Sequence, residues 1–118
     1  MEPSIADRGS HIEVRIGVPD LRGADFLDAL ARASGRFDRK PMLVLCDDPR
    51  REMDLDEAYR VGVDVARRFP LQAVAIVLRG RHASEAEYFT EVVAANRGAR
   101  VRYFQDIASA SSWLAAQQ

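Results

Sequence analysis

Charged and titratable side chains follow the two most apolar runs of this sequence. The runs, residues 42–46 (MLVLC) and 73–78 (AVAIVL), have the length and apolar composition of central parallel strands. Parallel sheets bind their ligands beyond the carboxyl ends of the strands. That edge therefore carries the candidate binding residues, which are Asp47, Asp48, Arg50 and Arg51 after the first run and Arg79, Arg81 and His82 after the second.

These charges have two interpretations. The functional one is a surface for an anion or a partner protein, to which the amino ends of helices add positive potential. The other is a set of solvated ion pairs among the residues themselves, each contributing about 0–1 kcal/mol to stability. We favour the ion pairs, because acidic residues after one strand are matched by basic residues after the next.

A metal site and a catalytic pair are both weakly indicated. Asp47 and Asp48 could hold Mg²⁺, but hard cations usually take more oxygen ligands than two adjacent carboxylates supply. His82 could act as a general base, but Ser84, the nearest hydroxyl, is better explained as a helix cap. We therefore expect no metal, no cofactor and no enzymatic activity.

Strands and helices alternate along the chain. Residues 11–18 alternate strictly between apolar and other side chains, which predicts a strand with one buried face near a sheet edge, and residues 100–104 predict a short last strand. The order β-α-β-α-β-α-β-α predicts an α/β fold with a mostly parallel four- or five-stranded sheet. Residues 1–10 are either a loose arm or a short extra strand, and residues 11–118 form one domain.

Local signals delimit the helices. The first helix is expected over residues 24–34, with Gly35 as a left-handed stop. Asp54 begins the second helix, and the apolar stripe of that helix includes Leu55 and Tyr59. Gly62 inside it costs about 1 kcal/mol relative to Ala, so we expect it to mark a close approach to the sheet.

Composition fits a single domain in a reducing compartment. The chain has 118 residues and a formal net charge of −1, so no overall field favours nucleic acid or a membrane surface. The lone Cys46 excludes an internal disulfide. No apolar stretch approaches the roughly 20 residues that span a bilayer, and residues 1–8 show no apolar signal region. We expect a cytoplasmic protein without nucleic-acid or integral membrane contact.

The last third of the chain resembles the end of one protein family. Residues 89–106 (FTEVVAANRGARVRYFQD) combine a helix, an Arg-Gly pair, a short strand ending in Phe and an Asp, and Trp113-Leu114 follows. This pattern resembles the SpoIIAA-like group of STAS domains, the anti-sigma-factor antagonists. The resemblance implies a β-α superhelix with about five strands, the first running against the others, and a regulatory module that binds another protein.

The resemblance also implies a phosphorylation switch, which this chain lacks. The antagonists carry Asp-Ser-Ser-Gly or Asp-Ser-Thr-Gly at the start of the helix after the second parallel strand, and a kinase phosphorylates the second hydroxyl residue. The matching stretch is 53–57 (MDLDE), where Asp56 stands at the phosphoacceptor position and Glu57 at the glycine. We expect a divergent member without this switch, with Asp54 and Asp56 among its candidate partner-binding residues.

Two functions remain open. The favoured one is a non-enzymatic STAS-like module with a protein partner. The alternative is a protein that binds a small anionic or apolar ligand, or an enzyme, and that uses Asp47, Arg50, Arg79 and His82. We also expect a homodimer through the strand at 11–18 or the helix faces beside it, because that edge is less guarded than the charged last strand.

Overall fold

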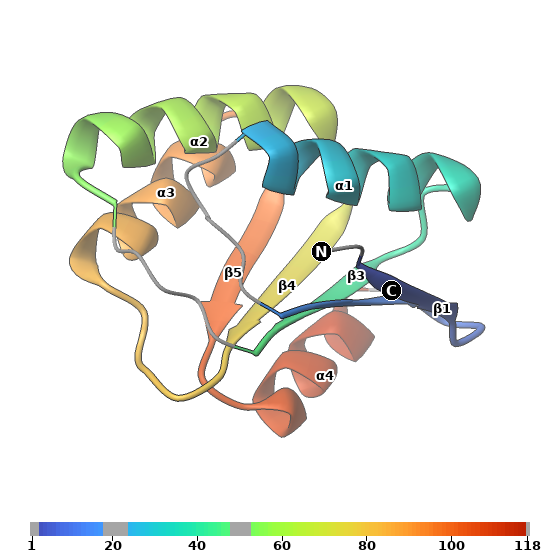
Figure 1. Ribbon diagram of the computed structural model, residues 1–118. Coiled ribbons are helices and arrows are strands. Elements are labelled where there is room, and N and C mark those ends of the chain that lie inside the picture. The colour runs from blue at the N-terminus through green and yellow to red at the C-terminus, as the bar shows by residue number, and fades with distance from the viewer. Residues whose placement is uncertain (1–2, 18–23, 48–52, 118) are drawn as a thin grey trace.

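A five-stranded sheet lies at the centre of the computed structural model, which describes residues 3–17, 24–47 and 53–117 (Figure 1). Its strands, in spatial order, are β1 (Ser4–Asp7), β2 (Ile12–Ile16), β3 (Met42–Cys46), β4 (Ala73–Leu78) and β5 (Arg100–Phe104). β1 is antiparallel to β2, and the other pairs are parallel. The helices are α1 (Ala24–Arg36), α2 (Leu55–Arg68), α3 (Glu85–Ala95) and α4 (Ile107–Ala116). The predicted α/β class with a mostly parallel sheet is confirmed.

Helices cover the two faces of the sheet unequally. α1, α2 and α3 lie on one face and α4 on the other (Figure 1). Every residue of β3 and β4 is buried, because both faces of these two strands are covered. Val44 and Ile76 belong to the larger core under the three helices, and Leu45 and Val77 belong to the smaller core with Leu114 of α4.

β2 is buried on one face, as its alternating sequence predicts. Ile12 and Val14 are buried in the larger core. Glu13 and Arg15 point to the opposite face, where α4 packs mainly on β3, β4 and β5. The strand is therefore polar where the sheet has no helix over it.

The amino-terminal segment is a strand rather than a loose arm. β1 pairs with β2 in the register Ile5 opposite Val14. The Lys40 ammonium lies 2.9 Å from a carboxylate oxygen of Asp7, and the Gly9 N–H donates to the same oxygen at 2.9 Å. These two contacts, the Gly9 hydrogen bond first, lower the pKa of Asp7.

The position of β1 corrects one expectation about self-association. β2 has a strand on each side, β1 and β3, so it has no free edge for a second copy of the chain. A homodimer through β2 pairing is therefore wrong. A homodimer through the neighbouring helix faces stays a prediction.

The sequence signals predicted the starts of α2 and α3 correctly, but not the end of α1. Asp54 and Ser84 begin α2 and α3 as expected, and each forms a capping box, with Glu57 and Glu87 respectively. Gly35 does not stop α1, because the helix continues to Arg36. The left-handed residues come later, at Asp38 and Arg39 with φ of 58° and 57°, and the Arg39 N–H closes the end by donating to the Ser34 carbonyl at 2.9 Å.

Gly62 faces α3 and not the sheet, which corrects the expected contact. A Cβ at this position would lie 2.8 Å from the Val93 Cβ and 3.0 Å from the Thr90 carbonyl oxygen. Because Val93 is buried, it has little room to move. Close packing of α2 on α3 therefore requires a glycine here.

Gly62→Ala should lower the free energy of unfolding by about 1–3 kcal/mol, because overpacking outweighs the better helix propensity of alanine. Urea denaturation measures this. Gly35→Ala in α1 is the matched control, since no described atom beyond the helix's own backbone lies within 4 Å of its Cβ position. The control should be neutral or stabilising by up to about 1 kcal/mol. A Gly62→Ala protein as stable as the control would contradict the packing.

Candidate functional site

The carboxyl edge of the sheet joins three of its charged residues in an ion-pair network. Asp47 follows β3 and Arg79 follows β4, and their side chains meet at 2.9 Å. Arg15 of β2 approaches the second carboxylate oxygen of Asp47, with Nε at 3.4 Å. The side chains are 36 % (Asp47) and 49 % (both arginines) exposed, so these are solvated pairs of the favoured kind, each worth about 0–1 kcal/mol.

Arg81 makes a different kind of pair, with the fully buried Glu87. Its two terminal nitrogens donate to the two carboxylate oxygens of Glu87 at 2.7 and 2.8 Å. The Ser84 N–H donates to the same carboxylate at 2.8 Å, and the His82 carbonyl accepts from Arg81 at 3.1 Å. The charge of Arg81 is thus directed inward, where it holds the loop between β4 and α3 on the first turn of α3.

Glu87 takes part in the charge pairing at the carboxyl edge of the sheet, and sequence reasoning did not identify it as a candidate. The sequence predicted a helix cap at Ser84, and in the structure Glu87 completes the capping box of that helix. The regular spacing of Arg81, Ser84 and Glu87 is the one signal that pointed further, because a loop that caps a helix can bring the arginine back over its first turn.

The remaining candidates have separate positions. The His82 side chain is exposed. The Asp54 carboxylate is used as the helix cap and accepts from the Glu57 N–H at 2.8 Å, and Asp56 is exposed on the first turn of α2. Within the described ranges, no three His, Cys, Asp or Glu residues are grouped so that they could hold a metal ion. Asp48, Arg50 and Arg51 lie outside the described residues.

Cys46, at the end of β3, is buried as its apolar run predicts. Burial, with a smaller effect from the neighbouring Asp47, raises the pKa of its thiol to about 12. A buried thiol with this pKa is protonated at neutral pH and is a poor nucleophile.

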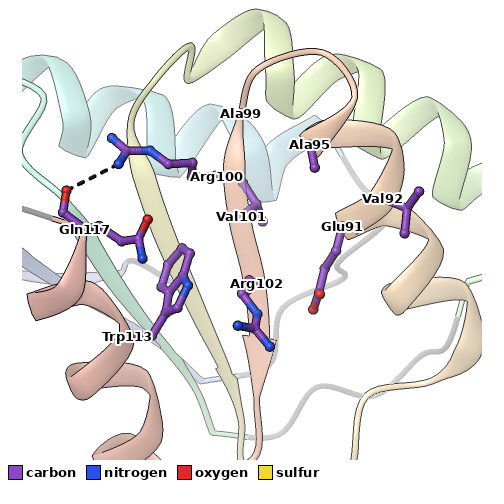
Figure 2. A pocket seen from close by; sticks show the side chains of 9 residues that line it. All are labelled: Glu91, Val92, Ala95, Ala99, Arg100, Val101, Arg102, Trp113 and Gln117. Carbon is purple, nitrogen blue, oxygen red and sulfur yellow. Dashed lines mark hydrogen bonds between the residues drawn. The ribbon is translucent and has the colours of Figure 1, made fainter.

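A groove of about 370 Å³ runs along β5, at a place where sequence reasoning predicted no site (Figure 2). β5 lies between α3, which contributes Glu91 and Val92, and α4, which contributes Trp113 (Figure 2). The Trp113 ring packs on Phe104 with 5.7 Å between centroids. Trp113 therefore belongs partly to the small core and partly to the wall of this groove.

Glu91 closes part of the groove by accepting from the Tyr103 N–H at 2.8 Å. Burial raises the pKa of Glu91, and the hydrogen bond from Tyr103 and the charge of Arg102 oppose that shift. A carboxyl whose pKa is raised in the folded state stabilises the fold below its ordinary pKa. That contribution is lost as the pH rises through the raised value.

Glu91→Gln keeps an acceptor for Tyr103 and removes the titration. Relative to the wild type, the variant should therefore become more stable as the pH rises from below the ordinary glutamate value of 4.5 to neutrality. Urea denaturation at a series of pH values measures the difference. Parallel pH profiles, or a change of the opposite sign, would show that burial does not dominate at Glu91.

Comparison with known proteins gave no matching family model, no matching curated protein and no matching solved structure. None of the helices in the described part of the chain is long and apolar enough to cross a membrane. Arguments about function therefore rest on the residues and contacts of this chain.

Proposed function

We propose that this chain is a non-enzymatic, STAS-like module that acts by binding another protein. Its sheet supports the family assignment, since four parallel strands are preceded by one antiparallel strand, as the sequence resemblance implies. The observation that best supports this function is that charged side chains at the carboxyl edge of the sheet are paired with one another. Asp47 is paired with Arg79 and Arg15, and Arg81 with Glu87, whereas catalytic groups must be directed at a substrate.

The outer side of α2 and α3 is the favoured partner surface. Leu55 is 57 % exposed, Tyr59 is 46 % exposed and Phe89 is 37 % exposed, and we call these three residues the α2–α3 surface. The two helices pack together, and Arg97, just beyond α3, lies over the Tyr59 ring and donates to its hydroxyl at 3.0 Å. Aromatic residues and arginine are enriched in protein interfaces.

The charges around this surface indicate the chemistry of the partner. Asp56 and Glu57 lie in the first turn of α2 and Glu85 in the first turn of α3. Asp56 and Glu85 are exposed, and exposed acidic side chains beside apolar ones fit a partner with a basic rim around an apolar centre.

Capture of a partner on the tagged 118-residue chain tests this proposal. The double variant Leu55→Glu with Tyr59→Glu should lose a partner that the wild type retains in stoichiometric amount. Leu71→Glu is the matched control, because Leu71 is 75 % exposed and precedes β4, at the opposite end of the sheet. Equal capture by all three proteins would contradict the surface, and the absence of any stoichiometric partner would contradict the function.

Serine kinases that act on anti-sigma-factor antagonists should leave residues 53–57 unmodified, because the segment has no hydroxyl side chain. In the structure, Asp54 is the helix cap and its N–H donates to Glu57 at 3.0 Å. The polar groups of Asp54 and Glu57 therefore cap the start of α2. Intact-protein mass spectrometry after incubation with such kinases measures this. A phosphate on Asp54 or Asp56 would contradict the prediction and indicate acyl-phosphate chemistry.

A further inference from the structure

We propose that the open edge of β5 binds an extended, acidic segment of a partner protein as an added strand. β5 is the last strand of the sheet and pairs only with β4 among the described strands. The Tyr103 N–H donates to Glu91 and so points away from β4. Because peptide groups alternate in direction along a strand, the N–H and C=O of Val101 also point to the open edge, where an incoming strand would pair.

The groove beside β5 has room for the side chains of such a segment. On the side of α3 its wall is formed by the apolar Val92, which is 54 % exposed, and Ala95, and by Glu91, whose carboxylate accepts from the Tyr103 N–H (Figure 2). On the side of α4 it is formed by Trp113 (Figure 2). An added strand would therefore place every second side chain on the side of Val92 and Ala95.

Basic residues of β5 favour acidic side chains at the alternate positions of the incoming segment. Arg100 and Arg102 are exposed on the face of β5 opposite to Val101 and Tyr103. Arg100 is held by donating to the uncharged carbonyls of Gln117 at 3.3 Å and Leu71 at 2.5 Å. Arg102 stacks over Phe104 at 5.5 Å and also interacts electrostatically with Glu91. Acidic residues at alternate positions of the incoming segment would lie beside these guanidinium groups.

The same charges argue against a second copy of the chain as the occupant. Two antiparallel β5 strands would place Arg100 and Arg102 of one copy on the same face as those of the other. Like charges on opposed strands destabilise the pair. The groove therefore favours a different, acidic chain, and it shares no residue with the α2–α3 surface, so the two proposals can fail independently.

Binding of short capped peptides to the 118-residue chain tests the inference. The probe is a six-residue peptide that alternates valine with glutamate, and the matched control alternates valine with lysine. We expect the glutamate peptide to bind, to shift the backbone amide signals of β5, and to slow hydrogen exchange at the Val101 N–H. Methylation of alternate peptide nitrogens should abolish binding, because it removes the donors that would face β5.

Charge reversal distinguishes this site from general electrostatic attraction. Arg102→Glu should weaken the binding of the glutamate peptide by about fivefold or more, which corresponds to about 1 kcal/mol. The same substitution should strengthen the binding of the lysine peptide. Arg60→Glu, an exposed site on α2, is the matched control and should change neither. Arg102→Gln serves as a second variant if the reversal disturbs folding.

Three results would overturn the inference. The first is equal binding of the two peptides, and the second is a loss of affinity that is equal for Arg102→Glu and Arg60→Glu. The third is protection of the Val101 N–H that rises with protein concentration in the absence of peptide, which would identify a second copy as the occupant.

Discussion

Arg81→Met should lower the free energy of unfolding by about 3–5 kcal/mol, the usual cost of removing one partner of a buried ion pair. Glu87 is 0 % exposed, and the guanidinium of Arg81 supplies its bidentate partner at 2.7 and 2.8 Å. Without Arg81, the Glu87 carboxylate would keep the Ser84 N–H but lose its opposite charge. Chemical denaturation at neutral pH measures the loss.

Arg79→Met is the matched control, because Arg79 also follows β4 and is paired with an exposed carboxylate, that of Asp47. It should cost only about 0–1 kcal/mol. Replacing both Arg81 and Glu87 with methionine should recover much of the loss, because no unpaired charge stays buried. If Arg81→Met cost no more than Arg79→Met, the inward direction of Arg81 would be wrong.

Ile76→Ala should cost about 2–5 kcal/mol, the range for truncating a buried isoleucine. Ile76 is 2 % exposed in β4 and lies between Val44 of β3 and Tyr103 of β5 in the register of the sheet. Denaturant melts measure the change. Val92→Ala, at an exposed position of α3, is the control and should stay within about 0.5 kcal/mol. A cost below about 0.5 kcal/mol for Ile76→Ala would mean that β4 is not a fully buried inner strand of the sheet.

The elements that sequence reasoning predicted well are those whose signals are local. β3 and β4 have the bounds of the two apolar runs, because a strand covered on both faces is apolar at every position. The starts of α2 and α3 follow from Asp54 and Ser84, whose side chains cap helices in any tertiary context.

Features that depend on distant parts of the chain were missed or misassigned. Leu55 and Tyr59 fit the apolar stripe of α2 but are exposed, because periodicity alone does not say how wide a face the neighbouring helix covers. Gly62 was expected against the sheet, but the close neighbour is α3, which follows later in the sequence. Both errors concern how α2 and α3 pack together.

The candidate site was predicted in part. Asp47 and Arg79 meet as expected, because strands paired in register bring their carboxyl ends to one edge. Arg81 was placed at the same edge, but its pairing with the buried Glu87 depends on the conformation of the loop between them. The groove along β5 had no sequence signal, since its walls come from α3 and α4 on opposite faces of the sheet.

A thermal-shift screen of the whole chain with nucleotides, phosphates and divalent metals tests the central claim most directly. A protein-binding module whose edge charges are paired with one another should show no saturable shift with any of them. The alternative, a ligand-binding protein or enzyme that uses Asp47, Arg50, Arg79 and His82, predicts the reverse. A reproducible, saturable shift that Arg79→Ala abolishes would contradict the proposed function.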